Sequence, residues 1–468
     1  MNETDFFVTP IDYSKKIGRC SSGTIVAKKD KKYLIIDIPE LTDREEKFFG
    51  RVLKELKYSK ININKKSDIY FFLKDFCIEN ATLLRKDQRE KIILLLEWET
   101  LGESILKPLL KDTSFEEIVI NGINKPIMVY HNVFGWLTTN AFFTSEEKIK
   151  TLLNKMAAPL GRQLTYNNPI LNATLRNGSR LNASMDPIAF SGINATIRKF
   201  RENPFTPIDI IEKKTISKEA MCFLWLAMQT NSSILICGNT GSGKTTTLNS
   251  LFCFLPNEER IVVTEETPEI VLPQEHKIKL NSAEQLKIGL EKLIENTFRM
   301  RPDRVIVGEV RSSEEASAFV NTMLAGQAKG SYATFHAESS EEALERMKSF
   351  GIEENALSSI DLIIVQKRLG RIDQKSGLRH EERKVCEICE LTKNEKGEVK
   401  IIKLFVLNHK TNTLKRVNES IRIKKKIMQT FSANEKEYLK LLNEKKKLLC
   451  KLKGDISFNE FFELVEKE

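Results

Sequence analysis

The sequence predicts an α/β protein with a mainly parallel sheet at its centre, a small α+β domain before it, and N- and C-terminal extensions. Two observations predict this fold class. Between residues 234 and 349, short apolar runs alternate with segments of helical character, the pattern of repeated strand–helix–strand units. A glycine-rich segment, residues 238–245, also follows the first apolar run directly and precedes a run compatible with a helix.

The bulk composition is that of a folded globular protein. The chain has 468 residues, of which 41% are apolar and 29% charged. Its net charge is 74 − 64 = +10, an excess that suits an acidic lipid surface or nucleic acid but also occurs without such partners. The longest apolar runs, residues 220–228 and 92–96, are far shorter than the ~20 residues of a membrane span. No secretory signal opens the sequence and the eight cysteines lie mostly apart, so we expect a cytoplasmic protein with reduced thiols.

Residues 1–100 form the first predicted region. Strand-like runs, such as residues 33–36, are mixed there with charged helical stretches, such as residues 83–96. The region carries no chemical motif. We interpret it as an N-terminal adaptor.

Residues 101–203 are predicted to form the small α+β domain. Its strand-like runs are bounded by turn residues, and one helix between them has apolar residues at helical spacing. Thr144 followed by Glu147 has the spacing of a capping box at the start of that helix. Residues 201–207, with two prolines among polar residues, have the composition of a linker. The expected strands are residues 117–122, 126–131, 134–138, 179–185 and 193–200.

Residues 204–370 are predicted to form the parallel α/β core. Strands buried on both faces of a sheet should be nearly all apolar, as residues 261–263 and 305–307 are. The expected strands are residues 234–237, 260–265, 304–309 and 331–335. The expected helices are residues 244–254, 283–298, 313–325 and 340–349.

Residues 371–468 form a Lys-rich C-terminal extension with α/β character. Its basic runs, residues 422–426 and 445–447, lie in helix-like segments and are interpreted as solvated helix faces. Cys386 and Cys389 form a lone CxxC pair. A structural zinc site would need a second pair, and the alternation around these cysteines favours a strand instead.

Residues 238–245 have the GxxxxGK[ST] pattern of a phosphate-binding loop. Its glycines allow backbone N–H groups and the N-terminus of the next helix to point at phosphate oxygens. Lys244 adds a charge for the β- and γ-phosphates, and the Thr245 hydroxyl can ligate Mg²⁺. We therefore predict that the protein binds ATP with Mg²⁺. The predicted nucleotide-binding residues are Gly238, Asn239, Thr240, Gly241, Ser242, Gly243, Lys244, Thr245 and Thr246.

Three further strand ends carry groups suited to hydrolysis, which needs a metal ion, an oriented water and positive charge near the γ-phosphate. The strand ending at Glu309 resembles a Walker B strand, although Gly308 stands where many P-loop enzymes have Asp. Glu309 is predicted to hold the metal through water or to polarise the attacking water. Glu265 and Glu266 belong to a group of three carboxylates in five residues, which suits either a nearby cation or an ordinary surface turn. His336 ends a third strand of the same predicted sheet.

These four segments, in this order and spacing, resemble the secretion and pilus-assembly ATPase superfamily of type II secretion, type IV secretion and type IV pili. The family calls them Walker A, Asp box, Walker B and His box. The resemblance covers residues 102–365 and includes residues 177–180, 196–200 and 300–303. Two departures are visible. Glu266 stands where Asp is common, and residues 324–330 lack the Thr-Gly-His of bacterial relatives, which is more similar to the archaeal-type branch.

The resemblance implies a RecA-like P-loop ATPase core and assigns roles within it. Glu309 is then essential for hydrolysis and, with Thr245, holds the metal. Either Glu265 or Glu266 is the catalytic or water-orienting carboxylate, and His336 is a γ-phosphate sensor.

The resemblance also implies partners and a mode of action. Arg180 and Arg198 look like arginines that the small domain brings to the nucleotide. Family members are hexameric rings that work with a polytopic membrane platform protein on pilin-like or secreted substrates, at the inner face of the cell membrane. Two alternatives remain: a conjugative DNA-transfer ATPase, and a nucleotide-binding scaffold without turnover. The sequence has no basic stretch interleaved with aromatic residues, so we do not expect nucleic acid as a partner.

Overall fold

The computed structural model describes the chain apart from residues 1–5, 29–30, 60, 62, 64, 102, 176, 201–202, 284–285, 327, 373–378, 395–396, 453, 455 and 468. Contacts between residues divide the chain into two compact units, Met1–Arg201 and Glu202–Glu468. Two positions of the expected linker, residues 201 and 202, lie outside the described residues. Among the helices that the structure describes, none is long and apolar enough to cross a bilayer.

The first unit is built on one sheet with the strand order β2-β3-β4-β7-β6-β5-β10-β9-β8, and β1 pairs with β7. The strands are β1 (Phe6–Val8), β2 (Lys15–Cys20), β3 (Gly23–Lys28), β4 (Lys31–Ile36), β5 (Phe115–Asn121), β6 (Pro126–His131), β7 (Gly135–Phe143), β8 (Ile170–Thr174), β9 (Arg180–Ser184) and β10 (Asn194–Arg198). The helices are α1 (Asp43–Tyr58), α2 (Lys66–Glu79), α3 (Lys86–Thr100), α4 (Leu106–Lys111), α5 (Glu146–Ala157) and the 3₁₀ turn η1 (Ala158–Leu160).

Residues 1–100 and 101–203, which the sequence suggested as separate regions, share this sheet and one apolar core. β4 pairs in parallel with β7, with Leu34 opposite Thr139, and β1 pairs with β7 in antiparallel orientation. Side chains of β3, β4 and α1–α3 are buried in the same cluster as those of β5–β10. A few short strands cannot bury a sheet face alone, so the N-terminal strands complete the sheet of the segment that follows.

The predicted capping box at Thr144 and Glu147 is wrong. α5 begins at Glu146, with Ser145 at its N-cap and no side-chain cap hydrogen bond. Glu147 is therefore at the second helical position, where its side chain cannot complete a capping box. The helix itself and the five expected strands of this region are present as β5, β6, β7, β9 and β10.

The second unit is the predicted parallel α/β core, continued by antiparallel strands. Its strand order is β13-β12-β14-β15-β11-β16-β17-β18-β19. The strands are β11 (Ile234–Cys237), β12 (Ile261–Glu265), β13 (Lys277–Asn281), β14 (Arg304–Val310), β15 (Gly330–Phe335), β16 (Leu362–Ile372), β17 (Arg379–Lys393), β18 (Val399–Asn408) and β19 (Thr413–Arg416). The helices and 3₁₀ turn are α6 (Pro207–Glu212), α7 (Lys218–Met228), α8 (Lys244–Leu251), η2 (Phe252–Phe254), α9 (Leu290–Thr297), α10 (Ser313–Leu324), α11 (Ser340–Ser349), α12 (Glu354–Leu357), α13 (Arg422–Thr430), α14 (Glu435–Lys451) and α15 (Phe458–Glu466).

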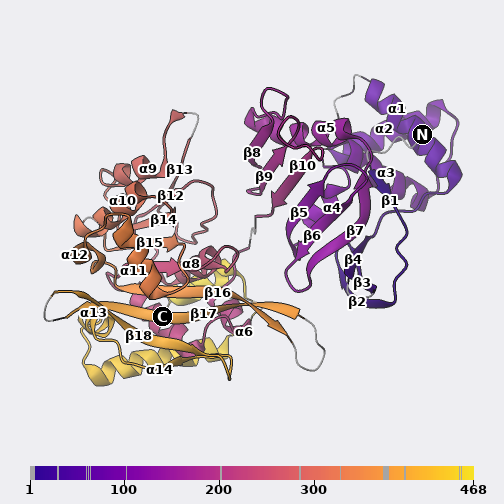
Figure 1. Ribbon diagram of the computed structural model, residues 1–468. Coiled ribbons are helices and arrows are strands. Elements are labelled where there is room, and N and C mark those ends of the chain that lie inside the picture. The colour runs from indigo at the N-terminus through magenta and orange to yellow at the C-terminus, as the bar shows by residue number, and fades with distance from the viewer. Residues whose placement is uncertain are drawn as a thin grey trace. The chain divides into compact units, whose positions relative to one another are not determined.

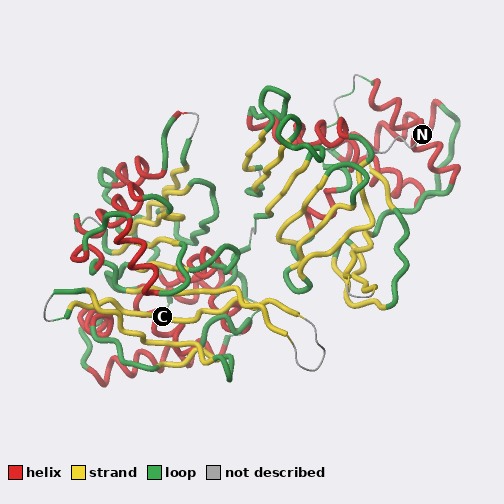
Figure 2. The backbone as a smooth tube through the Cα atoms, in the orientation of Figure 1, coloured by secondary structure: helices red, strands yellow, loops and turns green. Residues whose placement is uncertain are grey.

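Helices cover both faces of this second sheet, as Figures 1 and 2 show. The alternation along β11 assigns the faces, because successive side chains of a strand point to opposite sides. Ile234 and Ile236 pack with α7, α8 and α13–α15, whereas Leu235 and Cys237 pack with α9–α12. All four β11 side chains are fully buried, which explains why this strand is entirely apolar.

Two parts of the core differ from the expectation. The helix expected over residues 283–298 begins only at Leu290, since Ala283 and Ile288 form a β-bridge and Lys287 has a left-handed φ of 55°. β13 is an additional parallel strand beside β12, and its residues are all exposed or half-buried, so the apolar-run criterion did not find it.

The C-terminal extension is not a separate layer. β17 pairs with β16, and β18 and β19 extend the sheet of the core. Cys386 and Cys389 lie on β17, on a strand as expected. Within the Lys-rich helix α14, Lys446 and Lys447 are exposed, but Lys445 is buried with its ammonium 4.6 Å from the Trp225 ring centroid. The interpretation of the basic runs as wholly solvated is therefore wrong at Lys445, where packing against an aromatic ring offsets the loss of water.

Candidate functional site

The phosphate-binding loop connects β11 to α8 as predicted. Gly241 and Gly243 have left-handed φ angles of 74° and 92°, which residues with a Cβ rarely adopt, and Gly243 is the N-cap of α8. The loop therefore ends on a helix N-terminus whose first N–H groups have no partner within the helix. The Lys244 side chain folds back over the loop, and its Nζ donates to the carbonyl oxygens of Gly238 at 2.9 Å and Asn239 at 3.3 Å.

Glu309 and His336 meet beside this loop. β11, β15 and β14 are neighbouring parallel strands, so their carboxyl ends lie at the same edge of the sheet. Glu309 Oε1 lies 2.7 Å from His336 Nε2 and 4.0 Å from Lys244 Nζ. Glu309 Oε2 accepts a hydrogen bond from Arg311 Nε at 2.6 Å. The structure thus brings three predicted site residues into one contact group and adds Arg311 to it.

The surroundings of His336 favour its neutral form. Burial and, after it, the Lys244 ammonium lower the pKa of His336 below its ordinary value of 6.5, although Glu309 acts in the opposite direction. Since a carboxylate can only accept, Nε2 carries the proton and donates to Glu309, which leaves Nδ1 as an acceptor. The imidazole can therefore orient Glu309 through Nε2 and accept a hydrogen bond from a second group through Nδ1.

The two candidate carboxylates after β12 have different surroundings. Glu265 is 2% exposed, and its Oε1 accepts from the backbone N–H groups of Glu269 and Ile270, both at 2.8 Å. Its Oε2 is buried and has no hydrogen-bond partner among the described residues. Burial raises the pKa of Glu265 above its ordinary value. Glu266 is exposed and forms an ion pair with Arg311, which in turn holds Glu309.

Gly308 explains the missing Walker B aspartate. A Cβ atom at this position would lie 3.1 Å from the Cγ of Glu265 and 3.5 Å from its Cα. The Cα, Cβ and Cγ atoms of Glu265 thus occupy the space beside β14 where a longer side chain would otherwise lie.

Glu269, the third carboxylate of the same segment, contacts the loop threonine. Thr245 Oγ1 donates to Glu269 Oε2 at 3.2 Å, and Asn249 of α8 donates to the Glu269 backbone oxygen at 3.0 Å. Sequence reasoning named Glu265 and Glu266 for this segment and missed Glu269. The sequence did contain a signal, since Glu269 is one of the three clustered carboxylates. Only its contact with Thr245 in the folded structure identifies it as a site residue.

β16 and β17 also supply residues that the motif search missed. Gln366 of β16 is buried and hydrogen bonds to Ser242 and Thr247, and Arg383 of β17 donates to the Gly241 carbonyl oxygen at 3.0 Å. Neither residue belongs to a recognisable pattern. No signal in a single sequence connects them with a loop more than a hundred positions earlier.

Arg180 and Arg198 belong to the first unit, where they lie directly opposite each other on β9 and β10. Arg198 is exposed and Arg180 is half-buried. Like charges directly opposite on neighbouring strands repel. On its other side Arg198 lies opposite Glu117 of β5, so a carboxylate of the neighbouring strand faces it.

The residues of the loop fit a nucleotide with Mg²⁺. Besides Glu265 Oε2, Asn239 Oδ1 and Ser242 Oγ are buried without a hydrogen-bond partner among the described residues. Uncompensated buried polar atoms are rare and mark places where a ligand, ion or water supplies the missing contact. Oxygen donors also suit the preference of Mg²⁺ for hard ligands. Among the described residues, such oxygen donors beside the loop include Thr245 Oγ1, the Glu269 carboxylate 3.2 Å from it, and the Glu309 carboxylate.

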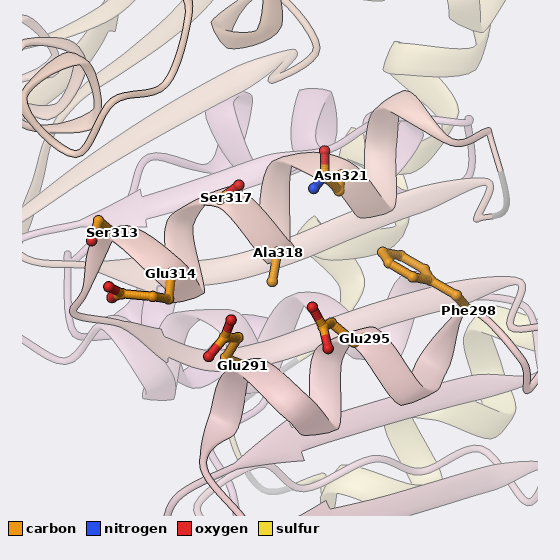
Figure 3. A pocket seen from close by; sticks show the side chains of 8 residues that line it. All are labelled: Glu291, Glu295, Phe298, Ser313, Glu314, Ser317, Ala318 and Asn321. Atoms are coloured by element: carbon orange, nitrogen blue, oxygen red, sulfur yellow. The ribbon is translucent and has the colours of Figure 1, made fainter.

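A separate groove lies between α9 and α10, with a volume of about 330 Å³ (Figure 3). Its lining includes the carboxylates of Glu291, Glu295 and Glu314. Glu291 and Glu314 lie in the first turns of their helices, where the helix dipole favours negative charge. None of the lining residues belongs to the loop or to the strand ends described above, so this groove is not part of the nucleotide site.

A family model for type II/IV secretion system proteins matches residues 103–450. The chain belongs to the type II/IV secretion system protein family. The match includes the phosphate-binding loop, both carboxylate segments and His336, and it continues through the strands and helices of the C-terminal extension. Membership agrees with the predicted RecA-like P-loop fold class and with the resemblance on which it was based.

The chain is also similar to individual proteins and to solved structures. The protein MJ0781 of Methanocaldococcus jannaschii, which has no assigned function, is 32% identical over 327 residues, or 66% of this chain. The type IV secretion system protein VirB11 of Bartonella henselae is 29% identical over 312 residues, covering 56% of this chain and 86% of that protein. The structure of the Legionella pneumophila ATPase DotB is 16% identical, covers 78% of this chain and 96% of that one, and has a TM-score of 0.44.

The chain spans about half the length of MJ0781 and of a second relative from the same organism, of which 44% and 49% are covered. These relatives agree with the archaeal-type branch of the family that the sequence predicted.

Proposed function

We propose that this secretion family protein hydrolyses ATP and uses the resulting domain motion to power assembly of pilus-like filaments or protein export through a membrane platform. The observation that supports hydrolysis best is the position of Glu309, whose carboxylate contacts His336 and Arg311 and lies 4.0 Å from the Lys244 ammonium. A carboxylate held at the γ-phosphate end of a P-loop is suited to orient or polarise an attacking water.

Each contact residue has a distinct part in this proposal. Lys244 would bind the phosphates, and Thr245 with Glu269 and Glu309 would hold Mg²⁺, which would neutralise charge on the phosphate oxygens when bound. Glu265, with one buried oxygen unpaired among the described residues, is the carboxylate that we favour over Glu266 for orienting water. Glu266 instead positions Arg311. His336 senses the γ-phosphate through the contact it shares with Glu309.

Arg180 and Arg198 are proposed to supply further positive charge to the nucleotide. Charge-assisted hydrogen bonds to phosphate are about twice as strong as neutral ones, so losing the γ-phosphate would release several strong contacts at once. This loss is the physical basis for coupling hydrolysis to movement. We further propose a homo-hexamer in the cytoplasm, bound peripherally to a polytopic membrane protein at the inner face of the cell membrane, with pilin-like or secreted proteins as substrates.

A phosphate-release assay on the purified chain tests the proposal. We expect Mg²⁺-dependent turnover that falls at least about a hundredfold in Lys244→Ala, Glu309→Ala and Arg180→Ala. Glu435→Ala, which removes an exposed carboxylate on α14, serves as the control and should retain the wild-type rate. Wild-type rates in any of the first three variants would contradict the assigned site.

The same assay with added single-stranded DNA distinguishes the alternative of conjugative DNA transfer. The filament or protein-export function predicts no stimulation and no salt-sensitive binding of DNA. Stimulation together with binding that weakens steeply with salt would favour the DNA-transfer alternative. Tight nucleotide binding without any phosphate release would support the alternative of a nucleotide-binding scaffold without turnover.

A further inference from the structure

Gln366 stands where β16 passes the phosphate-binding loop. β16 pairs in parallel with β11, and the last paired residues are Cys237 and Val365. Gln366 is therefore the residue beside which β11 ends and the loop begins. Its side chain is 2% exposed, so both ends of its amide need partners inside the protein.

Both ends of this amide are hydrogen bonded to the loop and its helix. Gln366 Nε2 donates to the Ser242 carbonyl oxygen at 2.8 Å, and Thr247 Oγ1 donates to Gln366 Oε1 at 2.6 Å. One side chain of β16 thus connects the middle of the loop to the first turn of α8. The pairs are 124 and 119 positions apart in sequence.

The two motif glycines also pack against this residue. A Cβ atom on Gly238 would overlap the Gln366 backbone carbonyl, and one on Gly243 would lie 2.9 Å from Gln366 Nε2. The outer glycines of the GxxxxGK[ST] pattern are therefore required here partly because Gln366 fills the space of their side chains.

A β-bulge aims Gln366 at the loop. The register between β16 and β17 shifts at this point, since Val365 lies opposite Glu387 but Gln366 lies opposite Val385. Bulges bend a strand and redirect side chains, and they occur often beside active sites.

The same strand pair holds the loop at a second point. Arg383 of β17 donates from Nε to the Gly241 carbonyl oxygen at 3.0 Å, and it lies directly opposite Arg368 of β16. Arg368 is itself paired with Glu381, at 2.7 Å from Nε to Oε2. Figure 1 shows β16 and β17 running side by side across the second unit.

We propose that Gln366 and Arg383 are positioning residues of the nucleotide site: the bulged strand pair β16–β17 clamps the phosphate-binding loop in its binding conformation. The inference rests on the proposed nucleotide site. Neither residue needs to touch the nucleotide. Because Gln366 and Arg383 hydrogen bond to the loop and to its helix, losing these contacts would change nucleotide affinity.

Nucleotide affinity of the full-length chain tests the clamp, with ADP and Mg²⁺ titrated in a calorimeter. In Gln366→Glu a carboxylate replaces the amide of the same shape and cannot donate to Ser242, so we expect the Kd for ADP to rise about tenfold. Gln274→Glu is the matched control, because Gln274 is equally buried and donates to the carbonyl oxygens of Phe252 and Leu255 rather than to the loop. Its Kd should stay within about twofold of the wild type.

Variants of the partners extend the test. Thr247→Val removes the hydroxyl that donates to Gln366 and should weaken ADP binding, whereas Thr247→Ser keeps it and should restore wild-type affinity. Arg383→Met should also weaken binding, while Arg371→Met, on the same strand pair but bound to Glu382 and Asn412, should not.

Steady-state kinetics separate positioning from general instability. Loss of loop geometry raises KM for ATP, whereas a partly unfolded variant lowers the apparent kcat at unchanged KM. If Gln366→Glu does not fold, the Thr247 pair still decides the question. The proposal fails if Gln366→Glu and Thr247→Val bind ADP as tightly as their controls. If the wild type releases no phosphate but ADP affinity still depends on Gln366, the motor function fails and the clamp stands.

Discussion

At Gly308 the lack of a side chain leaves room for the aliphatic part of the buried Glu265 side chain. Because a Cβ there would lie 3.1 Å from Glu265 Cγ, Gly308→Asp would crowd Glu265 and place a second negative charge beside it. We expect this change, which restores the residue common in P-loop enzymes, to lower kcat at least about tenfold and to cost about 1–3 kcal/mol of stability. Phosphate release and thermal unfolding measure both effects. Gly308→Ala is the smaller control, and higher activity in Gly308→Asp would contradict the account of Glu265.

The lowered pKa of a second residue, Lys199, predicts how the stability of the protein depends on pH. Its ammonium donates to the backbone oxygens of Leu109, at 3.0 Å, and Asp112, and burial lowers its pKa to about 8. The folded chain therefore releases this proton near pH 8, while the unfolded chain keeps it until about pH 10.4. In that window the unfolded state binds more protons, so this lysine makes stability rise with pH.

The comparison of wild type with Lys199→Met isolates this effect from other titrating groups. Between pH 7.5 and 9.5, the urea midpoint of the wild type should rise relative to that of Lys199→Met. The measurement is urea unfolding followed at both pH values. An equal change in the two proteins would show that Lys199 has an ordinary pKa.

At the scale of elements, one buried carboxylate attaches α13 to the core sheet. Asp361 is 2% exposed and precedes β16. It accepts from Lys426 Nζ at 2.7 and 2.8 Å and from the Ser233 backbone N–H at 2.8 Å, and it pairs with Arg422 Nε at 2.7 Å. Two basic residues of the Lys-rich extension, Arg422 and Lys426, thus attach α13 to the core sheet.

Asp361→Ala should release α13. Removing the carboxylate leaves two cations and a backbone N–H without their shared acceptor, which we expect to cost about 2–3 kcal/mol. Chemical denaturation and hydrogen exchange of residues 422–430 would measure the loss. Glu435→Gln, which removes only an exposed partner of Lys424, should change stability little. Equal effects of the two variants would contradict this role for Asp361.

At the scale of the whole molecule, two units with separate apolar cores should unfold in separable steps. The first unit has one core, and the second packs helices on both faces of its sheet. ADP with Mg²⁺ at about a hundred times its Kd should raise the transition of the second unit, which contains the loop, by about 5–10 °C. Differential scanning calorimetry measures this shift. Lys244→Ala should abolish it, and a shift that survives in that variant would place the nucleotide elsewhere.

The local motifs of the core were predictable because they encode backbone conformation and strand ends directly. The glycines of the loop, the apolar strands before Glu309 and His336, and the alternation of strands and helices all lie within short stretches of sequence. Parallel strands then bring their carboxyl ends to one edge of the sheet, so Glu309, His336 and Lys244 could be grouped from the sequence alone.

Contacts between distant segments could not be inferred in this way. Gln366 reaches Ser242 across 124 positions, β4 joins β7 across about a hundred, and Glu269 is distinguished from Glu266 only by where the chain turns after β12. Such contacts depend on which strands pair to complete a sheet and on which side chains pack together in the core. Neither property produces a periodic pattern in a single sequence. The sequence by itself therefore predicts the motifs that bind and react. Only the tertiary structure shows which distant residues contact and support them.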